Sequence, residues 1–188
     1  CKIGGYFKKK AKIDSIEEAF MDKRVIITKK AIKDAFVTLR QDKPIEKIYV
    51  ENLCREALIN KSTFYRYYTD IYDLVEQLQE EALEPIRQFL LENPVKEEDM
   101  ETFIDDIEVA ITQVYSANKP LFSNQDETLE KTFQLYQETI SENVSEEARL
   151  RLSFAVGGAY TILKNNQYTL NKDQKDTLYA LFKRIFAD

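Results

Sequence analysis

Residues 47–68 read KIYVENLCREALINKSTFYRYY, a stretch that predicts two short helices joined by a tight turn. The first helix has apolar residues at the i, i+3, i+4, i+7 spacing, namely Val50, Leu53, Cys54 and Ala57. Residues 58–60 form the turn, and Asn60 occupies the position of an N-cap, whose side chain is expected to accept a backbone amide of the next turn. In the second helix Phe64 and Tyr68 are four residues apart, so both face the same core.

A third apolar pattern lies upstream and predicts another helix. Its residues share the same helical spacing: Ile32, Ala35, Phe36 and Leu39. Thr28 is the expected N-cap of this helix, and Pro44 marks its exit. Three helices within about 45 residues, the last two joined by a tight turn, form the helix-turn-helix pattern, whose last helix enters the major groove of DNA.

The outward face of the last of these helices carries only side chains that donate hydrogen bonds, and none of them is acidic. Its members are Lys61, Ser62, Thr63, Tyr65, Arg66 and Tyr67. Two cations among hydroxyl donors suit phosphate oxygens and the O6 and N7 acceptors of guanine. The alternative is an ordinary exposed helix that happens to be polar; the complete three-helix pattern favours DNA binding.

The charge of the chain changes sign along its length. Residues 1–75 carry 16 Lys and Arg against 11 Asp and Glu, a net charge of +5. Residues 76–188 carry 11 against 22, a net charge of −11, so the total of −6 conceals a basic N-terminal part. This distribution suits a unit that binds a polyanion, joined to a soluble and self-repelling body.

Residues 47–68 also resemble the DNA-binding signature of TetR-type (TetR/AcrR family) transcriptional regulators, approximately I-T-V-x-x-I-x-x-x-A-G-V-S-x-x-T-x-Y-x-Y/H-F. The matching positions are Ile48, Val50, Leu53, Ala57, Ile59, Thr63, Tyr65 and Tyr67, with close replacements at Asn60 and Tyr68. The resemblance covers about residues 24–75. It implies an all-α fold with an N-terminal three-helix helix-turn-helix head, followed by a helical ligand-binding and dimerisation domain. Such a protein acts as a homodimeric repressor, which a small molecule releases from a palindromic operator in double-stranded DNA.

The resemblance also assigns contacts to individual residues. Those expected to contact phosphates are Thr28, Thr63, Tyr65 and Tyr67, and those expected to contact base edges are Lys61, Ser62 and Arg66. Three positions depart from the family pattern: Leu58 replaces the usual turn glycine, Tyr49 a capping threonine, and Ile71 a common lysine. A left-handed backbone at Leu58 is costly, so either the turn differs or the strain is tolerated. The Tyr49 hydroxyl is expected to reach a phosphate, and the loss of anchors predicts modest, salt-sensitive binding.

The chain is expected to divide into residues 1–20, an N-terminal extension or expression remnant, residues 21–75, the DNA-binding domain, and residues 76–188, the regulatory and dimerisation domain. Apolar stripes predict that the last part is helical throughout. Pro85 is expected to kink or end its first helix. Ser145 is expected to open a later helix that runs to about residue 166.

The helix that follows Ser145 is apolar on more than one side, which indicates a second partner besides its own core. Gly157 and Gly158 in its middle weaken the helix by roughly 1 kcal/mol each, so a close approach at this point is expected. Together with the apolar stripe of the last helix, it predicts a homodimer interface formed by Phe154, Gly157, Gly158, Thr161, Leu178, Leu181 and Phe182. The alternative is a central core helix of a monomer.

Aromatic and aliphatic residues of the C-terminal part predict a cavity for a small effector. The expected lining is Phe103, Ile107, Ile111, Tyr115, Phe122, Phe133 and Tyr136. An apolar or aromatic compound fits better than an anion, because this part of the chain is acidic. The alternative is that these residues are simply core.

The composition argues against an enzyme and against a metal site. The chain has no histidine, which removes Ser-His-Asp and Cys-His catalysis and the usual zinc sites, so no catalytic residue, cofactor or metal is expected. Cys54 is expected to be a buried hydrophobe in a reducing cytoplasm, where the protein is expected to act. No apolar run reaches the length of a membrane span, so no membrane partner is expected.

Two other function classes stay open. One is a protein-interaction adaptor whose helix-turn-helix no longer binds DNA, an alternative supported by the acidic body and the departures from the family pattern. The other is a helical enzyme that uses carboxylates such as Asp105 and Asp106, or Glu146 and Glu147. Adjacent residues on a helix point away from each other, so these pairs make poor catalytic dyads.

Overall fold

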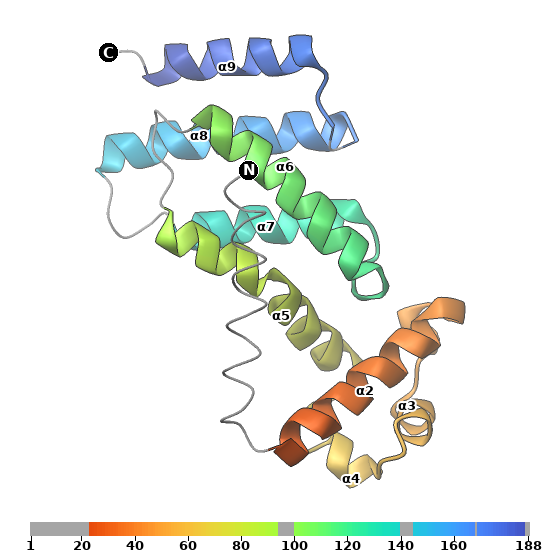
Figure 1. Ribbon diagram of the computed structural model, residues 1–188. Coiled ribbons are helices and arrows are strands. Elements are labelled where there is room, and N and C mark those ends of the chain that lie inside the picture. The colour runs from red at the N-terminus through yellow and green to blue at the C-terminus, as the bar shows by residue number, and fades with distance from the viewer. Residues whose placement is uncertain (1–22, 94–99, 140–144, 168, 187–188) are drawn as a thin grey trace. The chain divides into compact units, whose positions relative to one another are not determined.

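The structure is a computed structural model that describes residues 23–93, 100–139, 145–167 and 169–186. Over these residues the fold is all-α, as the sequence predicts, with eight α-helices, two 3₁₀-helices and no strand (Figure 1). The α-helices are α2 (Lys23–Asp42), α3 (Val50–Glu56), α4 (Lys61–Phe64), α5 (Ile71–Glu92), α6 (Met100–Ala117), α7 (Gln125–Thr139), α8 (Glu146–Asn165) and α9 (Lys172–Phe186). The 3₁₀-helices are η2 (Ile45–Lys47) and η4 (Lys119–Leu121).

The described residues form two compact units. The N-terminal unit consists of residues 23–82 and 118–123, and the C-terminal unit of the described residues within 83–117 and 124–186. Each unit has an apolar core of its own.

The core of the N-terminal unit lies where α2, α3 and α4 meet. α2 packs on α3, and α3 packs on α4. Ile32 and Phe36 of α2, Leu53 of α3 and Phe64 of α4 are all completely buried. The amphipathic spacing in the sequence therefore describes the inward faces of these helices correctly.

Residues 118–123 complete the N-terminal unit through long-range contacts that no local sequence pattern predicts. The Arg40 side chain donates from Nε to the Pro120 carbonyl (3.1 Å). Buried Gln79 donates from Nε2 to the Leu121 carbonyl (2.7 Å), which satisfies a polar group that would be costly to bury unpaired. Phe122 is buried beside them, so it belongs to the core of this unit.

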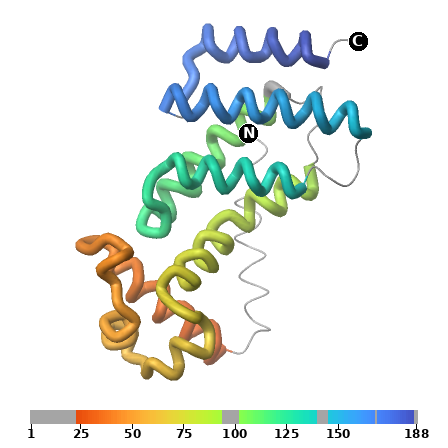
Figure 2. Tube along the Cα trace, turned by 180° about the vertical axis from the view of Figure 1, so that it is seen from behind, coloured from red at the N-terminus to blue at the C-terminus, as the bar shows by residue number. Residues whose placement is uncertain are grey.

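The C-terminal unit is a set of packed helices in which α7 contacts α6 and α8, and α8 contacts α9. Figures 1 and 2 show α9 running back alongside α8. α8 buries Leu152, Val156 and Leu163, and α9 buries Leu178 and Phe182. Ser145 is the N-cap of α8 and accepts the Ala148 amide (3.2 Å), which confirms the predicted start of this helix.

A charged cluster also joins α9 to α6. Lys175 Nζ lies 2.6 Å from Asp105 Oδ1 and 2.8 Å from Glu108 Oε2, and the Tyr179 hydroxyl donates to the same Asp105 oxygen (3.1 Å). Burial alone would lower the pKa of Lys175, but hydrogen bonds to the two carboxylates and their charge raise it well above its ordinary value. Lys175 is therefore held in its charged form.

One sequence-based expectation about a helix start is wrong, and one expected helix end is absent. Thr28 is not an N-cap, because α2 is already helical at Lys23, and the Thr28 hydroxyl donates back to the Arg24 carbonyl (2.7 Å). Pro85 was expected to kink or end its helix, and the structure excludes the end, because α5 continues through it to Glu92. The face of α5 that buries Leu83, Ile86, Phe89 and Leu90 accounts for this, since such burial outweighs a cost of about 3 kcal/mol.

None of the helices in the described ranges combines the length and the apolar character needed to cross a membrane.

Candidate nucleic-acid interface

The turn between α3 and α4 is a Schellman motif built on an unfavourable residue. The Ile59 amide donates to the Cys54 carbonyl (3.0 Å), and the Leu58 amide donates to the Arg55 carbonyl (3.3 Å). Leu58 has a φ of 55°, a left-handed conformation that favours glycine. Leu58 is 91% exposed, so no packing against the described residues offsets the strain. Of the two outcomes expected from the sequence, the structure shows that the strain is tolerated.

Both short helices begin without a side-chain cap. Tyr49 and Asn60 occupy the N-cap positions of α3 and α4, and neither side chain makes a capping hydrogen bond. The hydrogen bond predicted from a backbone amide to the Asn60 side chain is therefore absent. The first turn of α4 is tight, and the backbone carbonyl of Asn60 accepts the amides of Thr63 (2.9 Å) and Phe64 (3.2 Å) instead. Both side chains therefore stay available to an outside partner.

Aromatic packing anchors α4 to the N-terminal unit. Phe64 and Tyr68 are buried with ring centroids 5.5 Å apart, and Lys29 Nζ lies 5.8 Å from the centroid of the Tyr68 ring. Burial, followed by the negative charges of Glu81 and Asp73, raises the pKa of Tyr68 to about 12, so its hydroxyl stays neutral. The inward face predicted for this segment is confirmed.

The outward face of α4 and the residues just after it carries the predicted donors. Lys61, Ser62, Tyr65 and Arg66 are exposed. Thr63 and Tyr67 are half-buried, and Tyr49 at the start of α3 is exposed. The surface thus holds two cations and several hydroxyls, with no acidic residue within α4 itself. Such a surface can donate hydrogen bonds to phosphate and to base acceptors.

One acidic residue does lie on this surface, and the sequence analysis missed it. Glu51 of α3 places Oε2 at 3.4 Å from Lys61 Nζ and Oε1 at 3.9 Å from Arg55 Nη2. Glu51 and Lys61 are ten residues apart, and only the turn at Leu58 brings them together. Exposed pairs of this kind contribute between 0 and about 1 kcal/mol to stability. They matter more for how Lys61 interacts with a charged partner.

The segment after α4 is fixed by two carboxylates at the start of α5. Asp70 Oδ1 accepts the amides of Tyr72 (2.7 Å) and Asp73 (2.9 Å), while Asp73 Oδ2 accepts the Thr69 amide (2.6 Å). A hydrogen bond from Gln77, followed by those from Thr69, lowers the pKa of Asp73. Helix α5 is thus capped by these two carboxylates, and Ile71, which stands where the family has a lysine, is buried.

Thr28, the remaining residue expected to contact phosphate, is half-buried within α2. Its hydroxyl proton is already donated to the Arg24 carbonyl, so a phosphate contact requires that bond to break.

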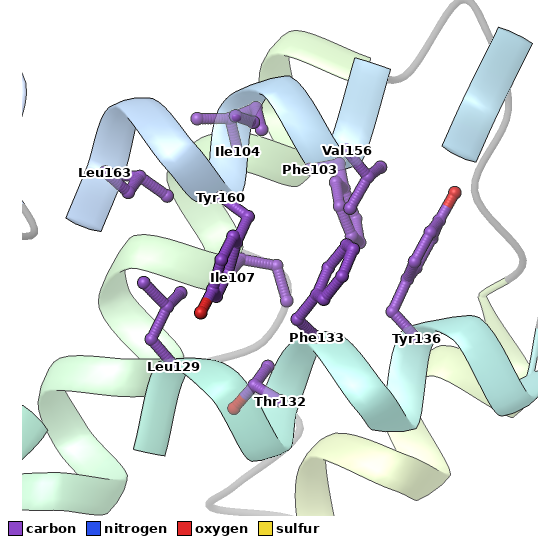
Figure 3. A pocket seen from close by; sticks show the side chains of 11 residues that line it. Phe103, Ile104, Ile107, Leu129, Thr132, Phe133, Tyr136, Val156, Tyr160 and Leu163 are labelled. Carbon is purple, nitrogen blue, oxygen red and sulfur yellow. The ribbon is translucent and has the colours of Figure 1, made fainter. Parts of the chain in front are cut away.

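The C-terminal unit contains a small cavity at the packing of α6, α7 and α8 (Figure 3). Four of the residues expected to form an effector pocket line it: Phe103, Ile107, Phe133 and Tyr136. Ile111, Tyr115 and Phe122 do not line it, and Phe122 lies in the N-terminal unit. Tyr160 of α8, which was not among the expected residues, also lines it and stacks on Phe133 with ring centroids 4.8 Å apart.

The cavity is small, and one of the residues that line it has an unsatisfied hydroxyl. Its volume of about 30 Å³ holds one or two waters, well below the roughly 300 Å³ of an ordinary ligand site. The Tyr136 hydroxyl is buried and has no hydrogen-bond partner among the described residues. Burial raises the pKa of Tyr136, so the group is a neutral phenol. A larger guest requires the side chains around the cavity to move.

The residues expected at a dimer interface fall into two groups. Leu178 and Phe182 are buried in the packing of α9 within the chain itself. The others are at least partly accessible on α8 and α9: Phe154, Gly157, Gly158, Thr161 and Leu181. A Cβ added at Gly158 would meet no atom within 4 Å, so nothing in the described part of this chain needs a glycine there.

No model of a protein family matches the chain, and no curated protein matches it. The described residues also contain no group of three or more His, Cys, Asp or Glu side chains that could hold a metal ion.

Proposed function

We propose that α2, α3 and α4 form a helix-turn-helix that binds double-stranded DNA, and that the protein is a transcriptional regulator of the TetR type. One observation carries the proposal. α4 is anchored by buried Phe64 and presents its donors outward immediately after a tight turn from α3. This is the arrangement in which a recognition helix offers its first residues to base edges.

Within this proposal the exposed side chains have separate roles. Lys61, Ser62 and Arg66 contact base edges, while Thr63, Tyr65 and Tyr67 contact phosphates together with Tyr49. Arg66 is exposed, and its planar fork of N–H donors matches guanine O6 and N7. The net charge of +5 over residues 1–75 supports the approach to a polyanion.

The regulatory part of the proposal is a homodimer that an apolar or aromatic effector releases from a palindromic operator. The exposed apolar face of α8 supports the second copy, because a two-fold dimer presents two recognition helices to successive turns of DNA. The cavity beside Phe133 supports the effector. At about 30 Å³ it represents a closed form that an effector must open.

The direct test is selection of random duplex DNA by the purified protein at two salt concentrations. Enrichment of a palindromic site is the expected result. Replacing Arg66 with alanine is then expected to weaken binding at one base position of that site by about 1–3 kcal/mol and to relax the preference there. Arg149→Ala removes the same charge from an exposed position in α8 and is expected to leave the preference unchanged.

Uniform weakening across all sequences in Arg66→Ala would make this residue a phosphate anchor instead. Absence of any enriched sequence at low salt would overturn the DNA-binding proposal.

A second candidate is an adaptor that uses the same surface to bind protein. Exposed Leu58, Tyr49 and Tyr65 favour it, because they present apolar area around the α3–α4 turn. The selection experiment separates the two candidates, since an adaptor enriches no DNA sequence.

A further inference from the structure

Glu51 is placed where it competes with DNA for a cation of the recognition surface. Its carboxylate lies 3.4 Å from Lys61 Nζ and 3.9 Å from Arg55 Nη2, and all three side chains are more than half exposed. The two contacts occupy different oxygens of one carboxylate, so Glu51 sits between the two cations. A phosphate that approaches Lys61 meets this carboxylate at short range.

A base edge and a phosphate respond differently to such a neighbour. The Lys61 ammonium has three N–H donors, and the contact with Glu51 uses one of them. The other donors can reach the uncharged O6 and N7 of guanine while the carboxylate remains in place. A phosphate is an anion, so its approach either breaks the Glu51–Lys61 pair or brings two negative charges together.

We propose that Glu51 is a specificity-determining residue, which directs Lys61 away from phosphates and toward base edges. This inference rests on the proposed DNA binding. Its consequence is that Glu51 weakens binding to arbitrary sequence more than binding to the selected site. The ratio between the two affinities therefore depends on an acidic residue that need not touch DNA.

The test compares Glu51→Gln with a matched control, Glu56→Gln. Both substitutions remove one negative charge from α3, but Glu56 is exposed and makes no ion pair within the residues that the structure describes. Affinity is measured for a random duplex and for the enriched duplex over a series of salt concentrations. Circular dichroism melting checks that each variant is folded.

Glu51→Gln is expected to bind the random duplex about 3- to 5-fold more tightly than the wild type, which is the scale of an exposed ion pair. The slope of log K against log salt is expected to steepen by about 0.9, because one more cation becomes free to displace a counterion. Affinity for the enriched duplex is expected to change less, so the specificity ratio falls. Glu56→Gln is expected to leave the ratio unchanged.

A second pair of variants identifies the cation involved. In a Lys61→Met background, Glu51→Gln is expected to have no effect on the specificity ratio, because the paired cation is gone. An undiminished effect in that background would overturn the assignment to Lys61. Equal gains from Glu51→Gln and Glu56→Gln would overturn the proposal and leave DNA binding intact. Failure of every protein, wild type included, to bind duplex DNA would overturn the proposed function itself.

Discussion

The outward faces of α4 and α8 differ in kind. Each helix buries one side in the core of its own unit. The open side of α4 carries Lys61 and Ser62, followed closely by Arg66. The open side of α8 carries Leu150 and Phe154, which are 64% and 72% exposed. These two residues are four apart, and Gly158 follows after four more, so they form one stripe along the helix.

The two surfaces suit different partners. A donor surface with cations is well hydrated in water and suits a polyanion. An exposed apolar stripe is unfavourable in water and suits an apolar partner such as a second copy of the chain. The proposed repressor uses both surfaces at once, because pairing through α8 provides two copies of α4 for one operator. The following experiments separate the two surfaces.

The largest expected effect comes from removing the support beneath α4. Phe64→Ala deletes a completely buried ring and is expected to lower the free energy of unfolding by about 3–5 kcal/mol, measured by urea denaturation. Tyr65→Ala is the matched control, since this residue is 56% exposed and its ring lies edge-on to Phe64. It is expected to cost about 1 kcal/mol or less. Equal losses of unfolding free energy in the two variants would contradict the assignment of Phe64 to the inward face and Tyr65 to the outward face.

The apolar stripe of α8 is tested by Phe154→Glu. A charge at the centre of an apolar interface is expected to raise the dimer dissociation constant about 30-fold or more, measured by analytical ultracentrifugation. Gln113→Glu adds the same charge at an exposed position of α6, off the stripe, and is expected to leave the dimer intact. A monomeric wild type, or a dimer that survives Phe154→Glu, would remove the role assigned to this face.

Leu58→Gly tests whether the turn beside the α4 surface is strained. The left-handed backbone accepts glycine without a steric cost, so the variant is expected to be more stable by up to about 1 kcal/mol. Leu58→Ala removes the exposed side chain but keeps a Cβ at the same φ, and is expected to bring no gain. If both variants gain stability equally in thermal denaturation, the exposed side chain rather than the backbone is the source of the cost.

The smallest expected effect is the dependence on pH at the start of α5. The pKa of Asp73 is lowered in the folded chain, so its contribution to stability is present above its unfolded pKa and is lost as the pH falls through the folded value. Asp73→Asn is therefore expected to melt slightly below the wild type at neutral pH. The two melting curves are expected to converge in acid. A difference that persists at the lowest pH would point to a cause other than charge.

Residue spacing was enough to predict most of the fold. Apolar stripes repeat at helical intervals throughout, and the Ser145 cap marks the start of α8 as predicted. Pro85 does not end α5 as a helix-breaking residue was expected to, because the burial of the residues around it outweighs its local effect. Thr28 misled because its hydroxyl bonds its own helix, which a cap signal in the sequence does not distinguish.

The candidate sites were predictable where they are local and unpredictable where they depend on packing. Lys61 and Arg66 lie in one short segment, so their shared exposure follows from the period of the helix. Glu51 reaches Lys61 only through the left-handed turn. Phe122 joins the N-terminal unit through hydrogen bonds from Arg40 and Gln79 to neighbouring carbonyls, and side chain to backbone contacts of this range leave no periodic trace in a sequence.

The central claim is that the surface around α4 binds DNA, and a salt titration of duplex binding tests it most directly. Fluorescence anisotropy is measured with a labelled random duplex between about 50 and 200 mM salt, where counterion release dominates affinity. DNA binding of this kind predicts that the logarithm of the binding constant falls linearly with the logarithm of the salt concentration. It also predicts that a Lys61→Ala, Arg66→Ala double variant binds more weakly, because both cations of the surface are removed. Absence of binding at the lowest salt, or a double variant indistinguishable from the wild type, would contradict it.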